Sequence, residues 1–127
     1  IEPLIINADA DLFKSVIYNF VDNAVKASFE GGKIELTCHS EGEYAVITVR
    51  DYGMGIAEED KKRIFEPFYM ADKVRSRKLG GAGLGLALCA EIAKKHNAKI
   101  ELESELGKGT IISICIKQSE GKINEQI

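Results

Sequence analysis

Hydrophobic positions along the chain follow two different periods, and each change of period predicts a new element. Between residues 10 and 29 apolar side chains recur at helical spacing, which is typical of an amphipathic helix. Residues 33–40 and 44–51 instead alternate apolar and polar side chains, which predicts two strands joined by a turn into a hairpin. The same reasoning predicts a short strand over 3–7, a short helix over 58–64, a helix over 84–96, and strands over 99–103 and 110–116.

The order of these elements predicts the fold class. The series β-α-β-β-α-α-β-β is that of an α+β protein, here a two-layer α/β sandwich of a mixed, mostly antiparallel sheet with helices on one face. With 127 residues, we expect a single domain over 1–127. In an antiparallel arrangement the end of strand 44–51 meets the start of strand 110–116. Asp51 and Thr110 would then lie together on the helix-covered face.

Composition and charge exclude several kinds of partner. The formal net charge of −3 argues against a general nucleic-acid-binding or membrane-binding surface. No apolar run reaches the ~20 residues that span a bilayer and no signal peptide is present, so we expect a cytoplasmic domain. Cys38, Cys89 and Cys115 each lie in an apolar stripe, which predicts buried, reduced thiols. Because the chain begins at Ile1 and not at Met, we expect it to be part of a longer protein.

Polar residues occur at positions where the pattern predicts a core. Asn19 and Asn23 lie one turn apart at the edge of the apolar stripe of helix 10–29, where amides need hydrogen-bond partners. Asp51 has the parity of the core-facing residues of its strand, and Gly53 and Gly55 follow it, which lets backbone approach a ligand closely. Neither feature is specific alone, because neighbouring backbone can satisfy the amides and Asp51 can cap the next turn.

A glycine-rich stretch precedes the second long helix. Residues 80–85 contain four glycines in six positions, and a flexible loop that opens into a helix N-terminus can bind an anion. A plain connector is the commoner role, and this loop matches neither the GxxxxGK(S/T) pattern nor GxGxxG after a strand. Residues 70–79 before it are polar and aperiodic, so we expect a mobile loop. Its cations Lys73, Arg75, Arg77 and Lys78 are either a solvated surface or phosphate clamps.

Taken together, five motifs in order resemble those of one family, the histidine-kinase-type ATP-binding domain of the Bergerat fold. NFVDNAVK at 19–26 resembles its N box, DYGMGI at 51–56 its first glycine box, and IFEPFY at 64–69 its F box. GAGLGL at 81–86 resembles its second glycine box, and GKGT at 107–110 its third. The motifs cover nearly the whole chain at fitting spacing, which makes the match specific.

The resemblance implies a binding site for ATP and Mg²⁺. Asp51 is expected to accept a hydrogen bond from the exocyclic amine of adenine, with support from Thr110 directly or through water. The ring would lie against Ile56 and Ala27, and Asn23 would supply an oxygen to Mg²⁺. Lys26 would reach the phosphates. The motifs also assign to the nucleotide site the residues Asn19, Gly53, Gly55, Tyr69 and Leu86, and backbone N–H groups of Gly81, Gly83, Leu84 and Gly85.

The loop over 70–79 corresponds by this resemblance to the ATP lid of the family. Lys73, Arg75 and Arg77 are then candidate phosphate contacts. Many relatives carry an arginine directly after the F-box tyrosine, and this chain has Met70 there, which leaves open which lid cation serves.

The branch of the superfamily is indicated by Asn19. Relatives that hydrolyse ATP with water carry a glutamate at this place as a general base, and an amide cannot accept a proton at neutral pH. The resemblance therefore implies a protein histidine kinase, with Asn19, Asn23 and Lys26 as its catalytic residues. They would transfer the γ-phosphoryl group to a histidine on a separate dimerisation and phosphotransfer domain of the parent chain, with a response regulator downstream.

The acceptor histidine itself is not expected within this chain. His39 lies near a hairpin turn, and His96 ends a helix, where a cation suits the helix dipole. Two other functions stay open at this point. One is a regulatory module that holds ATP without transferring phosphate, and the other is an ATPase that uses water. Whether the parent chain is anchored in the cell membrane also stays open.

Overall fold

A computed structural model describes residues 3–69 and 84–119. Two long helices, one short helix and four strands make up this part of the chain. In chain order they are α1 (Ala10–Ala27), β1 (Ile34–Glu41), β2 (Tyr44–Asp51), α2 (Glu58–Lys61), α4 (Gly85–Lys95), β3 (Lys99–Glu105) and β4 (Gly109–Lys117).

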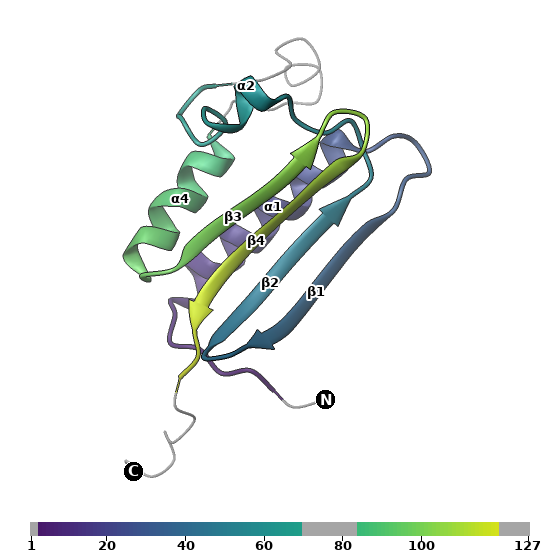
Figure 1. The fold of residues 1–127 in the computed structure, drawn as a ribbon. Coiled ribbons are helices and arrows are strands. Elements are labelled where there is room, and N and C mark those ends of the chain that lie inside the picture. Colours follow the sequence, from purple (N-terminus) through teal and green to yellow (C-terminus); the bar gives the residue numbers. More distant parts are fainter. Residues whose placement is uncertain (1–2, 70–83, 120–127) are drawn as a thin grey trace, which may run out of the picture.

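The strands form one sheet in the order β1-β2-β4-β3. Figure 1 shows α1 and α4 packed side by side on one face of this sheet, so the α+β two-layer sandwich expected from the sequence is confirmed. All three pairings between these strands are antiparallel. Among the described residues, therefore, no parallel pair supports the mixed sheet that the sequence predicted.

The strand expected over residues 3–7 is wrong in extent. This segment contributes a single antiparallel bridge, between Ile6 and Gln118, and the backbone N–H of Ser119 donates to the carbonyl of Ile5 at 2.7 Å. Pro3 has no N–H to extend the ladder, and Asp9 already caps the next helix, so little chain is left to pair.

Helix α1 begins with a defined cap and carries the largest apolar stripe. The Asp9 carboxylate accepts a hydrogen bond from the backbone N–H of Leu12 at 3.0 Å, which satisfies one of the unpaired groups of the first turn. The helix ends at Ala27, before the expected Phe29, and Ser28 is its C-cap. Its buried stripe, Phe13, Val16, Phe20 and Ala24, packs on the sheet.

The sheet face under the helices supplies the other half of the core. Ala45 and Val49 of β2 are buried there with three isoleucines of β4, Ile112, Ile114 and Ile116. Cys89, Ile92 and Ala93 of α4 complete the cluster. One face of α1, α4, β2 and β4 is thus occupied by the core, and the ends of these elements remain available to form a binding site.

The edge strand β1 departs from the sequence prediction. Leu36 and Cys38 share the inward parity of the core residues, yet Leu36 is 55% exposed and Cys38 is exposed as well. Helix α1 lies mainly over the inner strand β2, so the far edge of the sheet is left open. The expected burial of all three thiols is therefore correct only for Cys89, because Cys115 is partly exposed on the opposite face.

Candidate functional site

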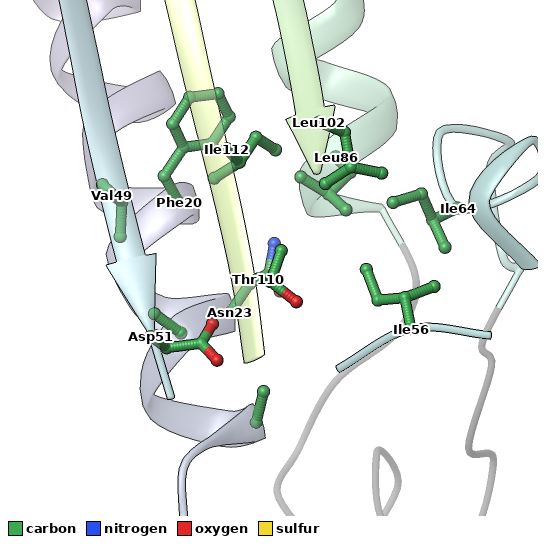
Figure 2. A pocket seen from close by; sticks show the side chains of 12 residues that line it. Phe20, Asn23, Val49, Asp51, Ile56, Ile64, Leu86, Leu102, Thr110 and Ile112 are labelled. Carbon is green, nitrogen blue, oxygen red and sulfur yellow. The ribbon is translucent and has the colours of Figure 1, made fainter. Parts of the chain in front are cut away.

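An open pocket lies at one end of the sandwich, between the C-terminal half of α1 and the strand ends of β2 and β4 (Figure 2). In this view Asp51 lies on one side of the pocket, and Ile56, Ile64 and Leu86 lie on the other. The lining is mostly apolar and comprises Phe20, Asn23, Ala24, Ala27, Val49, Asp51, Ile56, Ile64, Leu86, Leu102, Thr110 and Ile112.

Asp51 is the one ionisable side chain that lines the described pocket. It is the last residue of β2 and is only 5% exposed, and its Cα partner across the sheet is Thr110. The expected meeting of these two residues on the helix-covered face is confirmed. Burial raises the pKa of the Asp51 carboxyl above its ordinary value, and hydrogen bonds from the backbone N–H groups of Gly53 and Thr110 offset only part of this rise.

The loop after Asp51 is fixed by backbone contacts on both sides. The N–H of Met54 donates to the carbonyl of Ala27 at 3.0 Å, and the carbonyl of Met54 accepts from the N–H of Gly107 at 2.8 Å. A Cβ on Gly53 would stand 2.1 Å from the Ala27 carbonyl oxygen. Gly55 has a φ of +72°, and a Cβ there would stand 2.1 Å from the Glu105 carbonyl oxygen. Both positions therefore require glycine.

The two amides of α1 differ in their surroundings. The Nδ2 group of Asn19 donates to the carbonyl of Ser15 at 2.8 Å, and its Oδ1 lies against Gly85, where a Cβ would stand 2.6 Å away. Asn23 lines the pocket, and its Nδ2 is the one buried side-chain nitrogen or oxygen in the described part of the chain that has no hydrogen-bond partner. A buried amide without a partner points to a missing ligand.

Lys26 lies one turn beyond Asp22 on the same helix. Its Nζ forms an ion pair with the Asp22 carboxylate at 2.9 Å. The side chain is 29% exposed and does not line the pocket in this structure. It lies on the helix that carries Asn23, at the same end of the helix.

Tyr69 lies outside the pocket lining. Its hydroxyl donates a short hydrogen bond to the Asp60 carboxylate of α2, and the Arg63 guanidinium lies 4.5 Å from its ring centre. The hydrogen bond to Asp60 is the main reason that the pKa of the Tyr69 hydroxyl is raised. The short α2, which ends at Lys61 and not at the expected residue 64, is held by these contacts.

The second glycine motif is only partly described. Leu86 lines the pocket, Gly85 is the first residue of α4, and Leu84 is its N-cap without a side-chain hydrogen bond. The N-terminal amides of α4 thus have no side-chain cap from Leu84. Gly81 and Gly83, and the loop cations Lys73, Arg75, Arg77 and Lys78, lie outside the described residues, so their roles stay predictions.

Several residues of the site were missed from the sequence. Phe20, Ala24 and Val49 belong to the apolar faces of the predicted helix 10–29 and strand 44–51, and they also line the pocket. Ser104 lies beyond the predicted strand 99–103, but it belongs to β3 and bonds to Ile56, Gly109 and Thr110 beside the pocket. Its inward parity with Ile100 and Leu102 was the signal that could have found it.

The comparisons with known proteins agree with this geometry. Residues 8–120 match the family model described as histidine kinase-, DNA gyrase B- and HSP90-like ATPase. The chain belongs to this family. Sensor histidine kinase RppB of Synechocystis is 42% identical over 99 residues, which are 78% of this chain and 22% of RppB. Sensor histidine kinase WalK of Bacillus subtilis is 40% identical over 119 residues, which are 92% of this chain and 20% of WalK. The chain spans about a fifth of the length of these relatives.

Solved structures show the same fold. The mycobacterial sensor histidine kinase MprB superposes with a TM-score of 0.79 at 25% identity, over 89% of this chain and 76% of that one. Full-length ShkA in complex with AMPPNP superposes with a TM-score of 0.77 at 29% identity, over 92% of this chain and 24% of that one. The Bergerat fold expected from the motifs is thereby confirmed.

Proposed function

We propose that this domain binds Mg-ATP and transfers the γ-phosphoryl group to a histidine on a separate dimerisation domain of its parent chain. The observation that carries the proposal is the pairing of Asp51 with the unpartnered amide of Asn23 in one apolar pocket. The Asp51 carboxylate suits a hydrogen-bond donor on a flat apolar ring, and the Asn23 amide suits the polar end of the same ligand. ATP also agrees with the AMPPNP complex of ShkA.

The base-binding half of the pocket follows from Asp51. A carboxylate with a raised pKa in an apolar pocket gains most from a ligand that donates hydrogen bonds to it. The exocyclic amine of adenine is such a donor. Ile56 and Ala27 supply apolar surface for the ring, and Gly53 keeps side-chain atoms away from its edge.

The metal-binding half follows from Asn23. In the described part of the chain, no group of three or more histidine, cysteine or acidic side chains could hold a metal ion. Mg²⁺ binds to one or two protein oxygens when substrate phosphates and waters complete its shell, so the Oδ1 of Asn23 would serve as a ligand. The unpartnered Nδ2 of Asn23 is a donor, and it would pair with an acceptor such as a phosphate oxygen. When bound, Mg²⁺ neutralises charge on the phosphates. Lys26 would exchange its ion pair with Asp22 for a phosphate contact.

Transfer to an outside nucleophile is favoured over hydrolysis by Asn19. Its side chain is tied to Ser15 and packed against Gly85, and an amide cannot take a proton from water at neutral pH. The Asp51 carboxylate is occupied by its hydrogen bond to adenine and is not available as a general base. The described pocket therefore offers positioning and charge stabilisation, while the nucleophile and its base come from the phosphotransfer domain.

We place this reaction in the cytoplasm, with a response regulator downstream. Among the described helices, none is both long and apolar enough to cross a bilayer.

The test is phosphoryl transfer from labelled ATP. We expect this domain, mixed with the histidine-bearing helices of its parent, to form acid-labile phosphohistidine on those helices, and to release little free phosphate without them. Binding of ATP without transfer would identify a regulatory module. Release of free phosphate at the same rate with and without the helices would identify a water-using ATPase.

A further inference from the structure

Ser104 lies on β3 directly across from Thr110 on β4, and its hydroxyl is shared by three neighbours. It accepts a hydrogen bond from the backbone N–H of Ile56 at 2.8 Å and donates to the carbonyl of Gly109 at 2.9 Å. It also lies 2.8 Å from the Thr110 hydroxyl oxygen. Ser104 does not itself line the pocket, but Ile56 and Thr110 do.

Either hydroxyl of this pair can donate to the other, and counting protons favours one direction. A serine hydroxyl has one hydrogen and can accept two. The carbonyl of Gly109 can only accept, so the Ser104 hydrogen is directed to it, and one lone pair takes the N–H of Ile56. The remaining lone pair of Ser104 then takes the hydrogen of Thr110. This arrangement satisfies every group and leaves Thr110 with only lone pairs for the pocket.

We propose that Ser104 is a positioning residue for nucleobase selection, because it turns the Thr110 hydroxyl into a fixed acceptor beside the Asp51 carboxylate. Two neighbouring acceptors favour a base with an exocyclic amine, directly or through an ordered water, and disfavour a base with a carbonyl oxygen there. The inference deepens the proposed function, since it assumes that the base of ATP occupies this pocket.

The fold does not depend on the Ser104 hydroxyl alone. The loop that it contacts is also held by the bonds from Met54 to Ala27 and from Gly107 to Met54. Ser104→Ala should therefore leave this loop in place, while the Thr110 hydroxyl becomes free to rotate and to donate its hydrogen into the pocket.

The experiment compares the affinities of ATP and inosine triphosphate, which carries a carbonyl oxygen in place of the amine. We expect Ser104→Ala to lower the ratio of the two affinities by roughly tenfold, the effect of one misdirected hydrogen bond. Ser104→Thr restores a hydroxyl and should restore most of the ratio. Ser113→Ala is the matched control, because Ser113 forms a similar cross-strand hydroxyl pair with Thr48, 2.8 Å apart on the opposite face of the sheet.

Each outcome decides the matter. An unchanged ratio of the two affinities in Ser104→Ala would overturn the inference. If both nucleotides bind more weakly by the same factor, the role of Ser104 is merely structural. Should Ser104→Ala be too unstable to purify, Thr110→Val serves, because it removes the hydroxyl directly and must lower the ratio as well. If the unaltered domain binds neither nucleotide, the proposed function fails and this inference fails with it. Binding of ATP with an unchanged ratio in the variants overturns the inference alone.

Discussion

Asp51 is held at an energetic cost that a ligand can relieve. Desolvation raises the pKa of its carboxyl, so the folded domain binds a proton there more tightly than the unfolded chain does. The stability of the ligand-free domain should then fall as pH rises from the ordinary aspartate pKa through the raised one. A buried acid of this kind is typical of a binding site and not of a structural ion pair.

Asp51→Asn should therefore separate stability from binding. We expect the variant to be more stable than the unaltered domain at neutral pH without nucleotide, and this advantage to vanish in acid, where Asp51 is protonated. Its affinity for ATP should fall at least about tenfold, because the new amide can point a donor at the donor of adenine. Thermal melts across a pH series and calorimetric titration with ATP measure both effects. An unchanged affinity would remove Asp51 from the site.

The two amides of α1 provide a matched pair at the same scale. Asn23→Ala should make nucleotide binding insensitive to Mg²⁺ and abolish phosphoryl transfer, because it removes the Oδ1 proposed to bind the metal together with the unpartnered Nδ2 donor in the pocket. Asn19→Ala should keep Mg²⁺-dependent binding and slow transfer, because it loosens the contact between α1 and Gly85. Nucleotide titrations and phosphohistidine formation over a Mg²⁺ series distinguish them. Full transfer by Asn23→Ala would contradict the metal assignment.

At the scale of elements, the site forms at a junction where the end of one helix and the loops that follow two strands meet. The end of α1, the loop after β2 and the turn between β3 and β4 meet through backbone contacts: Met54 bonds to Ala27 and to Gly107, and Gly55 packs against the backbone of Glu105. Because these contacts are between main chains, side-chain identity matters there mainly through the absence of a Cβ.

Gly55→Ala tests this junction, and Gly42→Ala is its control. Both glycines have positive φ, +72° and +62°, but only at Gly55 would a Cβ meet backbone, whereas nothing lies within 4 Å of one at Gly42. Gly42→Ala should cost about 1 kcal/mol of stability and leave ATP affinity unchanged. Gly55→Ala should cost more stability and also weaken ATP binding, as measured by denaturation and by titration. Equal losses of stability with intact binding would show that the junction does not shape the pocket.

Much of the element layout could be predicted from the sequence, and the failures have physical causes. Strand parity correctly brought Asp51 to Thr110, because antiparallel register is set by the buried face. The apolar stripe of the same hairpin wrongly predicted a buried Cys38, since alternation does not reveal that β1 is an edge strand that α1 covers only in part. Ser104 was missed because the predicted strand ended at residue 103, whereas β3 extends to Glu105.

His96 shows the same limit of prediction from local sequence patterns. His96 does cap the C-terminus of α4, but its Nε2 accepts a hydrogen bond from the backbone N–H of Asp9 at 3.0 Å. This bond links the end of α4 to the start of α1. Contacts between elements far apart in sequence are not visible in local patterns.

At the scale of the whole molecule, the three thiols report on how the domain opens. Cys38 lies exposed on the edge strand, whereas Cys89 is fully buried between α4 and the sheet, and burial raises the pKa of its thiol to about 12. The thiolate is the nucleophile that attacks an alkylating reagent, so Cys89 should react only when the core is opened, while Cys38 should react in the folded state.

Nucleotide binding should then slow the modification of Cys89 and leave that of Cys38 unchanged. A ligand that binds only the folded state stabilises it by mass action, and at a concentration of about 100 Kd the opened population falls about a hundredfold. We expect Mg-ATP to slow the modification of Cys89 by about that factor, because labelling through rare global opening tracks its equilibrium population. Peptide mapping of alkylated thiols over time measures both sites in one sample.

Equal protection of the two cysteines would mean that nucleotide covers the β1 edge itself. Loss of Cys89 protection in Asp51→Asn would tie the stabilisation to the pocket, because Asp51 lines that pocket.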